Sequence, residues 1–378
     1  MKIISVTYND PGISWGPAIH FLELWSGVAR LHPEVEVAAF APSWTGNTPI
    51  LPVRFPLTRF RVPAIAKGRQ VLYDLMVAWR VLRRSNASDV VYLRLSQFHL
   101  FSTLALHWRR NQLVLELNGL LLDDAVSARR SRLMRSFVRW QEGALVRRAG
   151  GLISVSQGIA DTIRATYRPT GDLITLRNGV GMHFFDTCEP SPTTPQRGEP
   201  QVTILYVGTF TPWDGAARIV ELARHFPEVN FSFVGDGPAR KAVQAQATPN
   251  MKFVGRVAYA DLPQHYRRAQ AGIVLYEVQR HQRVHLSSLK TLEYLASGLP
   301  VFTTSVPGQD IVAELGCGVL SIDENLVDDF REFLRHLASY RSRAQAARAV
   351  MRRDHSWESV ADKTIAFIRG LKPMAVRP

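Results

Sequence analysis

Short apolar runs alternate with longer helical patterns along the first half of the chain. The runs that fit buried strands are Ile3–Thr7, Val35–Phe40, Val90–Leu93, Leu113–Leu117 and Leu152–Val155. Between them, segments such as His20–Leu31 and Leu72–Arg83 repeat apolar residues at the spacing of an amphipathic helix. Such alternation is typical of βαβ units, so the pattern predicts a parallel sheet covered by helices on both faces.

A polar stretch rich in Pro, Thr and charge interrupts this alternation and predicts an interdomain linker over 186–200. A second alternation follows, with strands expected at Val202–Val207, Asn230–Val234, Met251–Val254, Gly272–Leu275 and Pro300–Thr304. The sequence therefore predicts two α/β domains, one over 1–185 and one over 201–355. Residues 356–378 are expected to form a C-terminal helix that can cross back to the first domain.

The composition fits a globular enzyme. The chain has 378 residues, of which 46% are hydrophobic and 21% are charged, and this balance excludes wholesale disorder and a fibrous architecture. Two cysteines, Cys188 and Cys317, are too few for a disulfide scaffold or a Cys-rich zinc site. The N-terminus resembles a strand rather than a signal peptide, and no apolar window is long enough for a transmembrane helix. We therefore expect a cytoplasmic protein.

The positive charge is concentrated in the first half of the chain. The formal net charge is +14, and residues 1–180 hold 23 Lys and Arg against 12 Asp and Glu. This excess favours a face that meets an anionic partner. No nucleic-acid-binding module is recognisable and the arginines are dispersed, so we expect no nucleic-acid partner.

The segment Val126–Arg148 has the pattern of a basic amphipathic helix. One acid, Glu142, stands against Arg129, Arg130, Arg132, Arg135, Arg139, Arg147 and Arg148. Its apolar stripe consists of Leu133, Met134, Phe137, Val138 and Leu145. Such a helix can lie on an anionic membrane surface, which would suit a lipid-linked acceptor at the inner face of the membrane. Its apolar stripe could equally pack into the domain and leave a solvated cationic face, which is the commoner outcome.

The most informative helix lies within Leu286–Pro300. Ser287 or Ser288 can cap its N-terminus, where free N–H groups and the positive end of the helix dipole suit a diphosphate. Lys290 in the first turn opposes the dipole unless an anion lies nearby. Glu293, one turn later, could accept hydrogen bonds from a ribose diol. An ordinary surface helix with one Lys and one Glu explains the same residues equally well.

Glycines follow several predicted strands. Gly208, Gly235 and Gly255 each come at the end of a strand in the second half, where ligands of open α/β sheets bind. In the first half, Gly16 precedes the helix that is expected to begin near His20, without the spacing of a dinucleotide fingerprint. Any single glycine is explained by a plain turn, whereas three successive strand ends favour a ligand site.

Several of these segments together resemble a known family. They are Gly16…His20, Arg177-Asn178-Gly179-Val180, Gly208…Gly215, Gly235-Asp236-Gly237-Pro238 and Leu289-Lys290…Glu293-Tyr294-Leu295-Ala296…Gly298…Pro300-Val301. In this order they resemble the retaining glycosyltransferases of family 4, in the glycogen-synthase and mannosyltransferase superfamily. The resemblance implies the GT-B fold, in which two Rossmann-like domains face a cleft. It also implies transfer of a sugar from a nucleoside-diphosphate sugar to an acceptor hydroxyl with retention, in bacterial polysaccharide or glycolipid assembly.

The resemblance also implies roles for individual residues. Glu293 matches the second Glu of the family's E-x7-E motif, which holds the donor ribose. Ser287 and Ser288 match the loop that meets the donor phosphates and sugar. Arg256 matches a contact to the base, and Gly16 matches the glycine that approaches the diphosphate from the N-terminal, acceptor-binding domain.

The sequence departs from the family pattern in places. His285 stands where the first Glu of E-x7-E is expected, and Asn118 stands where a histidine is often found. Thr209 and Asp214 replace the basic pair that follows the first strand of the second domain. The expected catalytic residues are Lys290, Glu293, His285 and Asn118, and the expected donor-binding residues are Gly16, Gly208, Thr209, Arg256, Arg283, Ser287, Ser288, Lys290 and Glu293.

The cation that neutralises the leaving diphosphate is expected to be Lys290, with Arg283 and Arg256 as alternatives. The chain contains no D-x-D sequence, so we expect neither a metal nor another cofactor. His20 is a candidate general base. Two other functions remain open: a tailoring glycosyltransferase that acts on a soluble natural product, and an inactive protein that binds sugar nucleotides.

Overall fold

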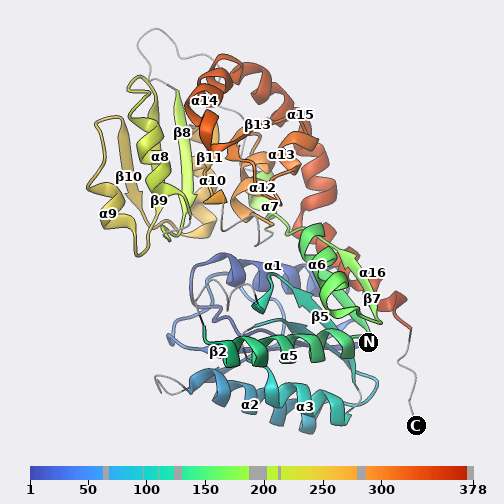
Figure 1. Cartoon of the computed structure of the whole chain (residues 1–378). Helices are drawn as coiled ribbons and strands as arrows, with labels where there is room; N and C mark the ends of the chain where they lie inside the picture. The colour runs from blue at the N-terminus through green and yellow to red at the C-terminus, as the bar shows by residue number, and fades with distance from the viewer. Residues whose placement is uncertain are drawn as a thin grey trace. The chain divides into compact units, whose positions relative to one another are not determined.

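The computed structural model consists of two α/β units, each with its own parallel sheet (Figure 1). It describes residues 1–62, 68–96, 98–109, 111–122, 130–186, 202–211, 214–278 and 287–372. The first unit comprises Met1–Arg177 and Trp357–Pro378, and the second comprises Asn178–Ser356. The predicted fold class, two parallel-sheet α/β domains, is confirmed.

The first unit is built on a seven-stranded sheet with the order β3-β2-β1-β4-β5-β6-β7. Its strands are β1 (Lys2–Val6), β2 (Glu36–Ser43), β3 (Leu57–Arg61), β4 (Val90–Arg94), β5 (Gln112–Leu117), β6 (Gly151–Ser154) and β7 (Asp172–Thr175). Its helices are α1 (Gly16–Leu31), α2 (Arg69–Arg84), α3 (Leu100–Arg109), α5 (Arg132–Arg148), α6 (Gln157–Tyr167) and α16 (Trp357–Gly370).

The two faces of this sheet are covered by different helices. Each of the helices α2, α3, α5 and α6 connects one strand to the next strand toward the β7 edge of the sheet. Since crossovers between parallel strands are right-handed, these four helices lie on the same face. The connection from β1 to β2 runs the other way, so α1 covers the opposite face, where α16 packs against it. The apolar side of the first helix group joins the inner strands in one buried core.

The second unit has a six-stranded sheet with the order β10-β9-β8-β11-β12-β13. Its strands are β8 (Thr203–Gly208), β9 (Asn230–Gly235), β10 (Met251–Gly255), β11 (Ala271–Val274), β12 (Val301–Thr304) and β13 (Gly318–Ser321). Its α-helices are α7 (Met182–Asp186), α8 (Ala216–Ala223), α9 (Arg240–Gln244), α10 (Leu262–Arg268), α12 (Leu289–Ala296), α13 (Ile311–Glu314), α14 (Leu326–Arg335) and α15 (Leu337–His355).

Three strands that the apolar pattern did not predict all lie at sheet edges. They are β3 and β7 in the first sheet and β13 in the second. Edge strands are covered less completely than central ones, so they need no continuous apolar run, and β7 has no fully buried residue. The first helix also begins at Gly16 rather than near His20, so Gly16 lies in its first turn.

The boundaries between the units differ from the expected ones. The first unit ends at Arg177 rather than at residue 185. The C-terminal helix, expected from residue 356, is α16 from Trp357, and it belongs to the first unit. Residues 187–200 of the predicted linker lie outside the described residues. None of the described helices is long and apolar enough to cross a bilayer.

Candidate functional site

The carboxyl ends of β8 and β11 mark the switch point of the second sheet. These two strands are neighbours, and the chain continues from them toward opposite edges. Open α/β sheets bind ligands at such a point, beyond the carboxyl ends of the strands. Three segments meet here, namely the loop after β8, the residues after β11, and the N-terminus of α12.

An ion pair connects two of these segments. The Nζ of Lys290 in α12 lies 3.2 Å from Oδ1 of Asp214, which follows β8. The other carboxylate oxygen of Asp214 accepts hydrogen bonds from the backbone N–H of Thr209 (3.2 Å) and from its hydroxyl (2.9 Å). Only 15% of the Lys290 side chain and 12% of the Asp214 side chain remain exposed, so this is a largely desolvated pair.

Two tyrosines surround the Lys290 ammonium group. Its nitrogen lies 5.3 Å from the ring centre of Tyr206 and 5.4 Å from that of Tyr276, within the range of cation–π attraction. Burial by itself would lower the pKa of Lys290, but Asp214 and these rings raise it well above its ordinary value. Burial would likewise raise the pKa of Asp214, but Lys290 and Thr209 hold it below its ordinary value. Both groups are therefore charged at neutral pH.

The N-terminus of α12 is fixed by hydrogen bonds around Ser288. Its hydroxyl oxygen accepts from the N–H of Thr291 at 3.3 Å, as the sequence predicted for a helix cap, and lies 2.9 Å from the hydroxyl of Tyr276. The preceding residue, Ser287, is held from the other side by Asn178, whose N–H donates to its hydroxyl (2.8 Å) and whose amide donates to its carbonyl (2.7 Å). The first turn of α12 thus presents its N–H groups from a rigid support.

Glu293 lies one turn further along α12 and is 4% exposed. Its Oε2 accepts a hydrogen bond of 2.9 Å from the hydroxyl of Tyr266 in α10. Burial and the Glu293 carboxylate raise the pKa of Tyr266 well above its ordinary value, so the tyrosine stays protonated and donates. This contact orients the carboxylate that the sequence assigned to the ribose.

The glycines of this region allow its loops to pack closely on one another. A Cβ on Gly215, where φ is +77°, would lie 1.5 Å from the carbonyl oxygen of Leu275 after β11. A Cβ on Gly235 would lie 1.9 Å from the carbonyl oxygen of Gly208. These close approaches are between protein segments, and they hold the three strand ends together.

Other predicted donor residues lie further from the ends of β8 and β11, or lie outside the described residues. Arg256 is exposed and follows β10, the edge strand two places from β8. Arg283 and His285 lie outside the described residues, as does Trp213 in the loop after β8. The structure thus brings Thr209, Ser287, Ser288, Lys290 and Glu293 to one end of the second sheet.

A cavity opens at the corresponding switch point of the first sheet, between β1 and β4. It has a volume of about 390 Å³ and lies beyond the carboxyl ends of β1, β4 and β5. Its walls combine aromatic rings, guanidinium groups and amides, and they include Asn9, Trp15, Trp44, Arg69, Arg94 and Asn118.

A buried carboxylate lies next to this cavity. Oε1 of Glu116 at the end of β5 lies 3.0 Å from Nε2 of His20 and 3.3 Å from Nη1 of Arg94, and it accepts a hydrogen bond from the Asn118 amide. Burial alone would raise the pKa of Glu116, but His20, Arg94 and Asn118 hold it well below its ordinary value. An ionised Glu116 therefore orients Arg94 and Asn118, both of which line the cavity.

His20, the candidate general base, is buried in α1. It is 5% exposed, pairs with Glu116, and packs edge-on against Trp357 of α16 at 4.8 Å between ring centres. Gly16 lies in the first turn of the same helix, α1.

The sequence did not single out several residues of these sites. Tyr206 and Tyr276 lie on or after strands, where an aromatic residue resembles any other core residue, and Tyr266 belongs to a short helix. Asn178 belongs to one of the segments that carried the family resemblance, but nothing in the sequence indicated its bonds to Ser287. A pattern search for polar or aromatic residues directly after each strand would have found Tyr276.

Both halves of the chain match models of known families. Residues 16–179 match the model described as a glycosyl transferase 4-like domain, and residues 201–339 match that described as glycosyl transferases group 1. Glycogen synthase of Mycobacterium tuberculosis is 26% identical over 256 residues, which cover 63% of this chain. The same stretch covers 58% of that relative, less than two thirds of its length.

Solved structures share the whole architecture. Sucrose-phosphate synthase from Thermosynechococcus elongatus aligns with a TM-score of 0.77 at 18% identity, over 98% of both chains. The Anabaena protein Alr3699/HepE, crystallised with UDP-glucose, aligns with a TM-score of 0.71 at 15% identity, over 98% of this chain and 100% of that one. At these identities the likeness establishes the fold.

Proposed function

Because this chain belongs to the glycosyltransferases of the family 4 type with the GT-B fold, we propose that it transfers a sugar from a nucleoside-diphosphate sugar to an acceptor hydroxyl. The observation that carries the proposal is the buried Lys290–Asp214 pair at the N-terminus of α12, over the switch point of the second sheet. It supplies a fixed cation where a diphosphate would bind.

The donor is held by the second unit. The diphosphate meets the Lys290 ammonium group and the N–H groups of the first turn of α12, while Glu293 accepts hydrogen bonds from the ribose. The Anabaena relative in fold was crystallised with UDP-glucose, which supports a donor of this chemical class.

The acceptor binds to the first unit, in the cavity beside Asn118. Aromatic rings and guanidinium groups in its walls suit a polyhydroxylated or anionic acceptor, and we propose a growing polysaccharide or a glycolipid. Trp15 and Trp44 supply apolar faces, and Arg94 supplies a cation that Glu116 holds in place.

The reaction breaks the bond between the anomeric carbon and the diphosphate oxygen. Lys290 and the helix N–H groups stabilise the charge that develops on this oxygen, an effect worth about 10²–10³ in rate at comparable sites. We propose retention: the acceptor oxygen bonds to the same face of the sugar, and its proton passes to the departing phosphate. With Lys290 as the cation, transfer proceeds without a divalent metal.

A thermal-shift panel tests the donor site. UDP, GDP, ADP and their sugars are added to the wild type, to Glu293→Gln and to Tyr266→Phe, each with Mg²⁺ or with EDTA. A ligand that binds only the folded state at 100 times its Kd stabilises it by about 2.7 kcal/mol. We expect one nucleotide series to raise the Tm in EDTA, with a large loss in Glu293→Gln and a smaller one in Tyr266→Phe, which keeps the carboxylate.

Failure of every nucleotide to raise the Tm of the wild type would overturn the donor site. Binding without turnover of the donor, by contrast, would indicate an inactive sugar-nucleotide-binding protein. Where turnover occurs, the anomeric configuration of the product, measured by NMR, decides between retention and inversion.

A further inference from the structure

Among the described residues of the first unit, three neighbouring helices carry most of the exposed large apolar side chains. Helix α3 packs against both α2 and α5, and the three lie together along one side of this unit (Figure 1). Their exposed apolar residues are Leu75, Trp79, Leu82, Leu104, Trp108, Leu133, Met134 and Trp140. Singly scattered residues of this kind need no explanation, but eight on three adjacent helices mark an interaction surface.

Two of these side chains are exposed over most of their surface. Trp108 is 83% exposed and Leu133 is 85% exposed, although both are among the most apolar residue types. The predicted stripe of α5 therefore divides: Val138 and Leu145 pack into the core, whereas Leu133 and Met134 do not. The N-terminal half of α5 is thus left with an unpartnered apolar side among the described residues.

The charge of this surface has one sign. The cations of α2, α3 and α5 are Arg69, Arg80, Arg83, Arg84, Arg109, Arg132, Arg135, Arg139, Arg147 and Arg148. The only acids in these three helices are Asp74 and Glu142, and both are fully buried. Asp74 accepts a hydrogen bond from Tyr8, and Glu142 accepts one from Tyr167. No carboxylate of these helices therefore offsets the exposed arginines, which are Arg69, Arg83, Arg84, Arg132, Arg139 and Arg147.

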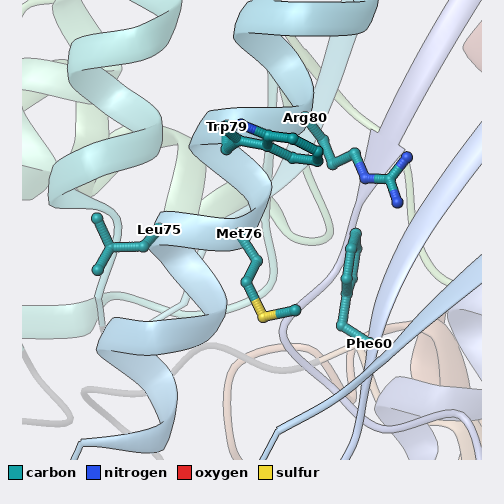
Figure 2. Close-up of a pocket in the computed structure, with 5 residues that line it drawn as sticks. All are labelled: Phe60, Leu75, Met76, Trp79 and Arg80. Atoms are coloured by element: carbon teal, nitrogen blue, oxygen red, sulfur yellow. The ribbon is translucent and has the colours of Figure 1, made fainter.

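Arginines and aromatic rings are interleaved on α2. The guanidinium carbons of Arg80 and Arg83 lie 5.2 Å and 4.8 Å from the ring centre of Trp79. Beside them is an apolar recess of about 300 Å³, in which Met76 points from α2 toward Phe60 and the Arg80 guanidinium lies over the Phe60 ring (Figure 2). An apolar recess rimmed by a cation fits an acyl chain with an anionic headgroup.

We propose that α2, α3 and α5 form a docking surface for an anionic lipid bilayer. Tryptophan and leucine enter the headgroup boundary while the arginines meet lipid phosphates, the arrangement typical of interfacial membrane binding. A nucleic acid would use the arginines but would not bury Leu104 or Leu133. A second copy of this chain would bring the same positive charge and be repelled. The inference rests on the outer surface of the first unit and does not depend on the transfer chemistry.

Vesicle co-sedimentation tests this surface. The full chain is mixed at low and high salt with vesicles of phosphatidylcholine alone or with phosphatidylglycerol added. We expect the wild type to sediment with the anionic vesicles at low salt, weakly at high salt, and not with phosphatidylcholine alone. Two variants test the apolar and the charged parts of the surface separately. The first is a triple variant that combines Trp79→Ser, Trp108→Ser and Trp140→Ser. The second is a double variant that combines Arg83→Gln and Arg84→Gln. Each should lower the binding constant about tenfold or more.

Matched controls lie in the second unit. Arg267→Gln with Arg268→Gln removes the same charge from exposed positions, and Ile322→Ser removes an exposed apolar side chain. Both should bind vesicles like the wild type. All variants should stay folded at the temperature of the assay and keep the wild-type nucleotide response, so a failure of docking is distinguishable from a failure of the donor site. The proposal is overturned if the wild type does not bind anionic vesicles, or if the control variants lose as much vesicle binding as the test variants.

Discussion

The ammonium group of Lys290 lies 3.2 Å from the carboxylate of Asp214, a residue 76 positions earlier in the chain. A lysine in the first turn of a helix opposes the helix dipole, so this placement is unfavourable unless an anion is close. Asp214 is that anion in the absence of a ligand. A bound diphosphate supplies two further negative charges at the same place, and it would share Lys290 with Asp214.

Lys290→Met should therefore affect both stability and activity. Removal of one partner leaves the Asp214 carboxylate buried and unpaired, which should lower the free energy of unfolding by about 3 kcal/mol. Loss of the cation should also lower kcat about 10²–10³-fold. The double variant Lys290→Met with Asp214→Asn separates the two effects in urea unfolding and turnover assays. It should recover most of the stability but not the turnover, and recovered turnover would show that Lys290 is not the required cation.

The sequence was sufficient for the fold and for the strand ends and helix that carry the candidate site, but not for the contacts between them. Central strands such as β4 are covered on both faces, so they need continuous apolar runs that are visible in the sequence. The edge strand β7 needs no such run, so the apolar pattern did not predict it. The cap at Ser288 was predictable because its partner Thr291 is only three residues away. The pairing of Lys290 with Asp214 was not predictable from the sequence, since it depends on which loops meet at the ends of β8 and β11.

The neighbours of single residues were not visible in the local sequence. His20 was predicted only as a candidate general base, and the fold gives it Glu116 and Trp357 as neighbours. The glycines after the strands were interpreted either as plain turns or as places where a ligand approaches the backbone. At Gly235 the absent side chain makes room for the carbonyl oxygen of Gly208. A contact between segments and a contact to a ligand have the same steric requirement, so sequence alone could not separate the two.

Gly215→Ala should destabilise the second unit strongly. The substitution places a Cβ 1.5 Å from the carbonyl oxygen of Leu275 and forces alanine to adopt a φ of +77°. We expect a loss of about 3 kcal/mol or more in the free energy of unfolding, together with weaker nucleotide binding because the neighbouring Asp214 moves. Gly46→Ala is the matched control: its φ is +76°, but no atom lies within 4 Å of the added Cβ. It should cost only about 1 kcal/mol, the price of the backbone conformation. Equal losses in the two variants would contradict a steric role for Gly215.

Glu116→Gln should weaken the first unit and change its response to acid. The amide leaves the Arg94 guanidinium buried without its counter-charge, which costs about 3 kcal/mol at neutral pH. In the wild type the folded pKa of Glu116 lies well below its unfolded value, so its stabilisation is present above about pH 4.3 and is lost as the pH falls further. Chemical unfolding between pH 3 and 7 should therefore give a flatter profile for Glu116→Gln. An unchanged slope would mean that the carboxylate is not held ionised by the fold.

Glu23 should make the first unit less stable at alkaline pH. This carboxyl group lies in α1, where burial and the nearby carboxylate of Glu358 raise its pKa to about 7, while Arg30 and Arg54 oppose the rise. A raised folded pKa means that the folded state binds the proton more tightly than the unfolded chain does. The stabilisation is therefore complete below the unfolded pKa and is lost as the pH rises through about 7.

The size of this loss is bounded by the shift from 4.5 to about 7, which corresponds to at most about 3 kcal/mol. Unfolding measured at pH 5 and pH 8.5 should show the decline in the wild type. Glu23→Gln keeps the shape of the side chain without the titrating proton, so its stability should change little over the same interval and should exceed that of the wild type at pH 8.5. The matched control is Glu228→Gln, which removes an exposed carboxylate from the second unit and should follow the wild-type profile. If Glu23→Gln declined in parallel with the wild type, a group other than Glu23 would have to titrate over this interval.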